Sequence, residues 1–176
     1  MPQLLLLRHA KSSWDEKELP DRDRPLAPRG RRAAGTIRQA MHSLGLTPDL
    51  VLVSPARRTM QTAEALEPWD ETPLTDPVEA LYLATASQML AVLREVAGTV
   101  RSVLVIGHNP GMHELALALV GAGAMPKAGE AERQLAAGFP TGALAEFFIP
   151  GPWSQLGPGG GRLLRFLTPR QLERVG

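Results

Sequence analysis

The stretch Leu4–His9 (LLLLRH) is an unbroken aliphatic run that ends on an arginine and a histidine. Two later runs share this pattern. Leu50–Val53 leads into a segment with two adjacent arginines, and Val103–Ile106 leads into a glycine and a histidine. Short continuous apolar runs are typical of strands buried on both faces, as in a parallel sheet covered by helices. The three runs therefore predict three central strands.

Helical patterns separate these runs. Apolar residues at helical spacing predict helices over Arg29–Leu44, Thr59–Leu66, Ser87–Val96 and from Asn109-Pro110-Gly111 to Leu119, with Asn109 as the cap of the last one. Ala143–Ile149 and Leu163–Leu167 predict two further strands. The alternation of strands and helices predicts one α/β domain over residues 1–176, a three-layer αβα sandwich with a mostly parallel central sheet.

Two segments are less well defined by the sequence. Pro150–Gly161 is rich in glycine and proline but contains Trp153, and it fits either a binding flap or a surface hairpin. Gly121–Gly138 fits a short helix, a lid or an insert, and the sequence does not indicate its role.

Composition excludes several classes of protein. Lysine and arginine total 19 against 18 acidic residues, so the net charge of +1 offers no global field for nucleic acid or an anionic membrane. The chain has no cysteine, which excludes disulfides, thiolate metal sites and a cysteine nucleophile. The apolar run near the N-terminus is too short to span a bilayer or to act as a signal peptide, so we expect a cytoplasmic protein. The sequence does not indicate an oligomeric state.

Arginines and histidines follow all three central strands: Arg8, His9, Arg57 and His108. Because ligands bind outside the carboxyl ends of the strands in an open parallel sheet, we expect these side chains to line one crevice. Guanidinium groups fork two hydrogen bonds onto phosphate oxygens and stay charged at physiological pH. A neutral histidine nitrogen is a nucleophile for phosphorus, and nearby guanidinium charges favour the neutral form. The pattern predicts a pocket that binds and transfers a phosphoryl group.

This chemistry requires no metal ion, because preorganised cations stabilise the charge that spreads over the equatorial oxygens in the transition state. The sequence contains neither a His-Glu-x-x-His motif nor a glycine-rich loop ending in Gly-Lys-Ser/Thr. The amide end of the helix after Asn109 adds an anion-binding feature at the same crevice. We therefore expect no metal and no cofactor.

The stretch Leu7-Arg8-His9-Ala10-Lys11-Ser12-Ser13-Trp14 resembles the signature of the histidine phosphatase (phosphoglycerate mutase-like) superfamily. The usual Arg-His-Gly is Arg-His-Ala here, as in the SixA-type phosphohistidine phosphatase branch. Residues 21–30, 54–63 and 107–111 follow in the order of that branch, and Pro140-Thr141-Gly142 resembles the start of its late strand. The resemblance spans nearly the whole chain and implies the phosphoglycerate mutase-like fold.

The resemblance also implies roles for single residues. His9 is the phosphoacceptor, Arg8 and Arg57 are the phosphate clamps, and His108 is the second pocket histidine, which binds the phosphoryl group and orients its transfer. Glu79 lies near the position of the family's usual general acid and is the candidate for that role. His42 and His113, which lie on predicted helices, are interpreted as structural.

The predicted function is a two-step phosphatase reaction through phosphorylated His9. The resemblance favours phosphohistidine on a protein partner, because the chain lacks the long insertions with which mutases and sugar phosphatases cover their sites. Three alternatives remain: a phosphatase of small phosphomonoesters, a mutase, which must exclude water, and a non-catalytic module that binds phosphate or phosphopeptides and needs no working His9.

Overall fold

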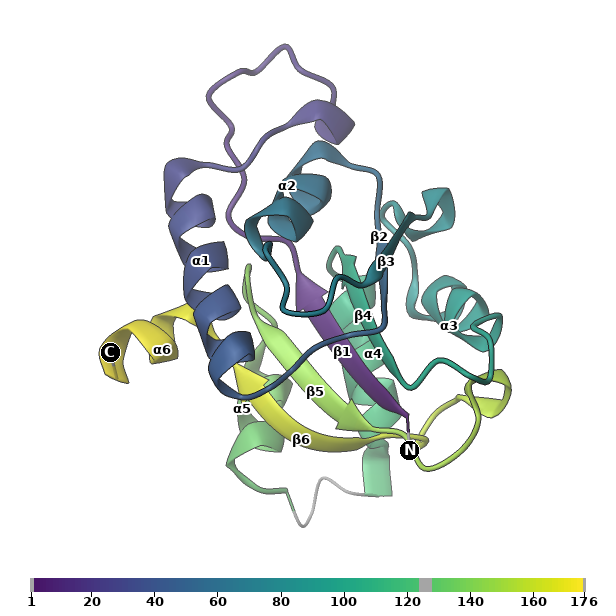
Figure 1. Ribbon diagram of the computed structural model, residues 1–176. Coiled ribbons are helices and arrows are strands. Elements are labelled where there is room, and N and C mark those ends of the chain that lie inside the picture. Colours follow the sequence, from purple (N-terminus) through teal and green to yellow (C-terminus); the bar gives the residue numbers. More distant parts are fainter. Residues whose placement is uncertain (1, 124–127, 176) are drawn as a thin grey trace.

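Six strands form one mixed sheet in the computed structural model, which describes residues 2–123 and 128–175 (Figure 1). The strands are β1 (Gln3–Arg8), β2 (Leu50–Val53), β3 (Leu74–Pro77), β4 (Ser102–Gly107), β5 (Leu144–Phe148) and β6 (Arg162–Leu167), in the spatial order β3-β2-β4-β1-β5-β6. The pairs β3–β2, β2–β4 and β4–β1 are parallel, whereas β5 is antiparallel to both of its neighbours. The mostly parallel sheet predicted from the sequence is confirmed.

Helices cover both faces of this sheet, which gives the predicted three layers (Figure 1). One face packs against α1 (Pro28–Ser43), α2 (Arg57–Ala65) and α6 (Pro169–Val175). The other face packs against α3 (Ala86–Arg94), α4 (Gly111–Val120) and α5 (Glu130–Ala137). No helix within the described ranges is long and apolar enough to cross a membrane.

The central strands are apolar because both of their faces are covered. In β1, Leu4 and Leu6 belong to the core under α3 and α4, whereas Leu5 and Leu7 belong to the core under α1 and α2. All four leucine side chains are almost completely buried. Full burial of one such side chain stabilises a fold by roughly 1.5–3 kcal/mol, so the run that ends on Arg8 and His9 is among the most firmly anchored parts of the chain.

Strand β3 and helix α6 lie where the sequence predicted no element, and helix α5 fits one of the alternatives left open for Gly121–Gly138, a short helix. The edge strand β3 is exposed along its length and ends in Pro77, so it has neither an apolar run nor an alternating pattern. Helix α5 buries only Leu135 and lies within the segment that the sequence left undefined. Residues 124–127 of that segment lie outside the described part of the chain. Helix α6 has seven residues, too few for a clear periodicity.

The Pro150–Gly161 loop packs at the end of the sheet remote from His9. Trp153 in this loop is 1% exposed, and its indole Nε1 donates a hydrogen bond to the carbonyl of Val100 at 2.8 Å. Val100 lies two residues before the start of β4, at the strand end opposite to His108. Of the two alternatives, the hairpin describes the loop, and no residue of it lines the pocket that contains His9, as a binding flap at that site would.

Candidate active site

The carboxyl ends of β1, β2 and β4 bring the predicted residues to one edge of the sheet. In the parallel register Arg8 pairs with Gly107, and Val53 pairs with Ile106, so His9, Ser54 and His108 follow at adjacent positions. A pocket of about 290 Å³ opens there. It is lined by Arg8, His9, Lys11, Ser12, Trp14, Asp21, Arg24, Arg58, Leu83, His108, Asn109 and Thr141.

His9 is held with one ring nitrogen available to the pocket. The side chain is 7% exposed, and its Nδ1 lies 2.7 Å from the carbonyl oxygen of Ala10. A carbonyl only accepts, so Nδ1 carries the proton and Nε2 keeps its lone pair. Burial, together with the charges of Arg58 and Arg8, lowers the pKa of His9 from 6.5 to about 4, although the bond to Ala10 opposes this shift. At neutral pH His9 is an uncharged nucleophile.

His108 is fixed beside His9 by hydrogen bonds at both ring nitrogens. The two ring centroids are 5.5 Å apart, and His108 is 3% exposed. Arg58 donates from Nη2 to Nδ1 at 3.2 Å, so Nε2 carries the proton and donates to the hydroxyl of Ser54 at 2.7 Å. Burial and the charge of Arg58 lower the pKa of His108 to about 3. The ring is therefore neutral and oriented.

The arginine that reaches the pocket is Arg58, and the prediction of Arg57 as a clamp is corrected. Arg58 lines the pocket with a side chain only 3% exposed, whereas Arg57 is exposed at the first position of α2 and does not line it. Successive helical residues point about 100° apart, so only one of two neighbours faces the crevice. The sequence shows that an arginine follows β2, but which one turns inward depends on where α2 begins.

Arg8 lies in the pocket as predicted, and the segment before β5 orients it. Its Nη1 donates to the carbonyl of Phe139 at 3.0 Å, and the same carbonyl accepts from Nδ2 of Asn109 at 2.9 Å. Burial and the charge of Arg58 lower the pKa of Arg8 from its ordinary value. Within the described residues the buried Nε atoms of Arg8 and Arg58 have no hydrogen-bond partner. Two incompletely compensated cations beside His9 favour a bound anion.

Asp21 is a central residue of the site that sequence reasoning missed. Its Oδ2 accepts from the hydroxyl of Tyr82 at 2.6 Å and from Nη2 of Arg58 at 3.0 Å, and its Oδ1 accepts from Nε of Arg24 at 3.2 Å. Arg24 in turn donates to the hydroxyl of Ser12 at 2.8 Å. Although burial raises the pKa of Asp21, the bonds from Tyr82 and Arg58 outweigh this effect and lower it to about 2. Asp21 and Arg24 stand in the block of residues 21–30, which was the signal available in the sequence.

Glu79 lies outside the pocket, so its prediction as general acid is not supported by its position. Its exposed carboxylate forms a bidentate ion pair with Arg22, and neither residue lines the pocket. The hydrogen bond from Arg22 lowers the pKa of Glu79, and burial opposes this only partly. The carboxylate is charged at neutral pH, which is the wrong state for a proton donor.

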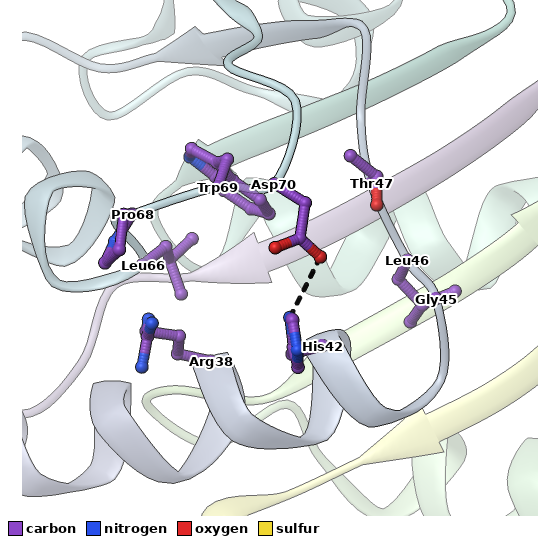
Figure 2. A pocket seen from close by; sticks show the side chains of 9 residues that line it. All are labelled: Arg38, His42, Gly45, Leu46, Thr47, Leu66, Pro68, Trp69 and Asp70. Carbon is purple, nitrogen blue, oxygen red and sulfur yellow. Dashed lines mark ion pairs between the residues drawn. The ribbon is translucent and has the colours of Figure 1, made fainter.

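The remaining histidines have structural positions, as the sequence indicated. His113 donates from Nε2 to the carbonyl of Leu135 at 2.6 Å and so ties α4 to α5. Figure 2 shows His42 on α1 pointing towards Asp70. Nδ1 of His42 lies 3.4 Å from Oδ2 of Asp70, and both residues line a small pocket of about 50 Å³. None of the residues around this small pocket lines the pocket that contains His9.

The arrangement can hold a doubly charged phosphoryl group against a neutral imidazole. Arg8, Lys11, Arg24 and Arg58 face the same pocket, and Asp21 is its one carboxylate among the lining residues. The amino end of α4 begins beside His108, where the helix dipole favours an anion. Within the described residues no cluster of histidines and carboxylates has the composition of a metal site. The fold and these lining side chains together define a phosphoryl-binding α/β protein.

Comparison with known proteins places the chain in a family. Residues 4–78 match the model of the histidine phosphatase superfamily (branch 1). An uncharacterized protein of Mycobacterium tuberculosis is 34% identical over 93% of this chain and 100% of its own length. The structure of the proposed phosphohistidine phosphatase SixA from Nakamurella multipartitia superposes with a TM-score of 0.83 at 28% identity, over 96% of both chains. Its counterpart from Agrobacterium tumefaciens gives 0.80 at 29% identity, over 96% of this chain and 99% of that one.

The chain belongs to the histidine phosphatase superfamily and to its SixA-type branch. It is a phosphatase with the phosphoglycerate mutase-like fold.

Proposed function

We propose that the protein hydrolyses phosphohistidine on a partner protein without a metal ion, through a phosphorylated His9. The proposal rests on the protonation states of the histidine and the carboxyl groups in and around the pocket. A neutral, oriented imidazole lies among buried arginines, whereas the carboxyl groups of Asp21 and Glu79 are ionised and bound to arginines.

In the first step, Nε2 of His9 attacks phosphorus and the bond from phosphorus to the leaving group breaks. The proton on Nδ1 stays in its hydrogen bond to the carbonyl of Ala10, so the new phosphohistidine is formed as an imidazolium. Arg8 and Arg58 stabilise the charge on the equatorial oxygens. His108 keeps the guanidinium of Arg58 in place through its bond to Nη2.

The leaving group argues for phosphohistidine over an alkyl phosphate. An alkoxide needs a proton as it departs, and an ionised Asp21 cannot supply one. A phosphorylated imidazole binds a proton at its second ring nitrogen, with an ordinary imidazole pKa near 6.5, and then departs as a neutral ring. Such a substrate carries its own acidic proton, which matches a pocket whose one lining carboxylate, Asp21, is ionised and bound by arginines.

The second step releases phosphate. The oxygen of a water molecule attacks phosphorus, the bond from phosphorus to Nε2 breaks, and both protons of the water stay on the phosphate, which is released as H2PO4⁻. His9 leaves as a neutral imidazole, with its Nδ1 proton still held by Ala10. Both half-reactions therefore use the same tautomer, and a single backbone carbonyl maintains it.

The mouth of the pocket supports a substrate carried by a protein. Trp14 and Leu83 line it and are 66% and 53% exposed, so the pocket offers an accessible aromatic side chain and an accessible aliphatic one. Trp14 is held in place because the guanidinium of Arg24 stacks 3.5 Å from its ring centroid. An imidazole that enters between these side chains finds apolar contact surface.

The test is phosphate release from a phosphohistidine-containing protein and from a panel of small phosphomonoesters, in the presence of EDTA. We expect the phosphohistidine substrate to react much faster than the esters, His9→Ala to be inactive, and His42→Ala, a histidine change remote from the pocket, to be as active as the wild type. Preference for the esters would contradict the substrate class. Phosphate binding without turnover of any substrate would contradict the enzyme and favour a binding module, and loss of activity in EDTA would contradict metal independence.

A further inference from the structure

A second, larger cavity adjoins the active-site pocket. It has a volume of about 690 Å³, against about 290 Å³ for the pocket that contains His9. Lys11 and Thr141 line both cavities, so the two cavities adjoin each other at these residues. The larger one, here called the basic groove, is lined by Lys11, Arg29, Arg32, Ala33, Pro140, Thr141, Thr168, Pro169, Arg170 and Glu173.

The walls of the basic groove are fastened to the peptide that carries His9. The amide of Ala27, which precedes α1, donates to the carbonyl of Lys11 at 2.9 Å. A Cβ at Gly30 would lie 2.0 Å from that same carbonyl, so only glycine permits this close approach of α1. On the other wall, the amide of Gly142 donates to the carbonyl of His9 at 3.0 Å. The groove therefore keeps a fixed position relative to the nucleophile.

Helix α6 contributes one wall of the groove, through Pro169, Arg170 and Glu173. Figure 1 shows α6 beside α1, and the two helices are in contact. Pro169, the first residue of α6, packs against Gly142. A Cβ at Gly142 would lie 2.9 Å from Cγ of Pro169. Gly142 has a φ of 76°, in the left-handed region that glycine adopts without strain. Arg170 follows Pro169 and is thereby brought to the same cavity as Lys11.

The charge of the groove is strongly positive although the whole chain is almost neutral. Lys11, Arg29, Arg32 and Arg170 are all exposed and line it, against the single carboxylate of Glu173. Within residues 2–123 and 128–175, none of these four cationic side chains forms an ion pair or a hydrogen bond with another residue. The groove thus presents four cations to solvent, next to the phosphoryl pocket.

One of these cations, Arg29, lies in the first turn of α1, where the helix dipole disfavours a positive charge. The first turn of α1 contains no acidic residue and carries Arg29 directly after Pro28, with Arg32 one turn further. The amino end of a helix carries a partial positive charge and is stabilised by anions rather than by arginines. The helix therefore gains nothing from the charge of Arg29, whereas an anion bound in the groove would be stabilised by the arginines and by the helix.

We propose that the basic groove binds an acidic segment of the partner protein next to its phosphorylated histidine. This inference rests on the proposed function and adds a recognition element to it. The groove is more than twice as large as the phosphoryl pocket, so it accommodates several residues rather than one further small anion. Its four cations are spread over the Lys11 loop, α1 and α6, which suits an extended chain of carboxylates.

The experiment compares two phosphohistidine peptides that differ only in their flanks, one with glutamates and one with glutamines beside the phosphorylated residue. Turnover is measured with the wild type, the double variant Arg29→Gln/Arg32→Gln and the single variant Arg170→Gln. The control is Arg31→Gln, an exposed arginine of the same helix turn that does not line the groove. A small phosphoramidate serves as a substrate that needs only the phosphoryl pocket. Binding of both peptides is also measured directly with His9→Ala protein, which does not depend on turnover.

The wild type is expected to show a KM about tenfold lower for the acidic peptide, as a few exposed charge pairs would give, and this advantage should shrink at high salt. The double variant and Arg170→Gln should lose the advantage, whereas Arg31→Gln should keep it, and all four proteins should turn over the phosphoramidate equally. The proposed role of the groove would be contradicted if the wild type had equal KM values for both peptides, or if Arg31→Gln lost the advantage for the acidic peptide as fully as the groove variants. If the wild type turned over none of the substrates, the proposed function would be contradicted instead. The binding measurement with His9→Ala would then still show whether the groove prefers the acidic peptide.

Discussion

Replacing Arg58 by alanine is expected to remove most of the activity, and replacing its neighbour Arg57 is not. The guanidinium of Arg58 is buried, donates to the backbone carbonyl of Asp21 at 2.7 Å, and holds Nδ1 of His108 at 3.2 Å. Loss of one preorganised donor to a developing oxyanion costs roughly 2.7–4 kcal/mol, or about 10²–10³ in kcat. Arg57 is exposed, so Arg57→Ala is expected to change kcat by less than about threefold, as for other surface substitutions.

The assay is phosphate release under saturating substrate, with thermal unfolding of each variant as a control for folding. Arg58→Lys is included because lysine keeps the positive charge but cannot donate two parallel hydrogen bonds as a guanidinium does. Its kcat should lie between those of the wild type and Arg58→Ala. The reasoning would be refuted if Arg57→Ala lost as much activity as Arg58→Ala while both variants remained folded.

Three further predictions follow from the hydrogen bonds and charges of the site. Ser54→Ala removes the hydroxyl that accepts the Nε2 proton of His108 at 2.7 Å. A buried donor left unpaired costs about 1–3 kcal/mol, so kcat/KM should fall by about tenfold. An unchanged kcat/KM would show that Ser54 does not orient the ring. Histidine NMR should give pKa values of about 4 for His9 and about 3 for His108, both below the ordinary 6.5 because of burial and the nearby arginines. Both rings then bind protons more readily in the unfolded chain, so the free energy of unfolding should decrease as the pH falls from about 6.5 towards 4, and a rise over this range would contradict the assigned states. Glu79→Gln should leave kcat for small phosphomonoesters within about threefold of the wild type, since the carboxylate lies at the surface with Arg22, and a loss of two orders of magnitude would restore Glu79 as the general acid.

The frame of the fold followed from the sequence because its strands are buried on both faces. Leu4–Leu7, Leu50–Val53 and Val103–Ile106 have no polar residue to compete with the strand pattern, and each lies within a strand of the structure. Since these strands are parallel neighbours, their carboxyl ends had to meet, which brought His9 and His108 together.

Exposed elements could not be predicted in the same way. Strand β3 is held by backbone pairing to β2, and backbone pairing does not require a pattern of apolar and polar side chains in the sequence. Helix α5 becomes defined through tertiary contacts, such as the bond from His113 to the carbonyl of Leu135. These contacts join residues far apart in the sequence, and a local pattern carries no information about them.

The site shows a similar division. His9, His108 and Arg8 follow directly from the strand ends, but the choice between Arg57 and Arg58 depends on the phase of α2. The partners of Asp21 depend on a loop folding back over the sheet edge, where its carboxylate meets an arginine 37 positions away. Proximity created by tertiary structure is therefore the part that the sequence did not reveal.

The central claim is that His9 carries the phosphoryl group between the two steps. The most direct measurement is to mix the protein rapidly with substrate, quench in alkali, where a phosphohistidine survives, and locate the added phosphate by mass spectrometry. The account predicts a transient phosphate on His9 that is lost in acid and absent from His9→Ala. Steady turnover with no phosphorylated His9, or with the phosphate on His108 instead, would contradict it.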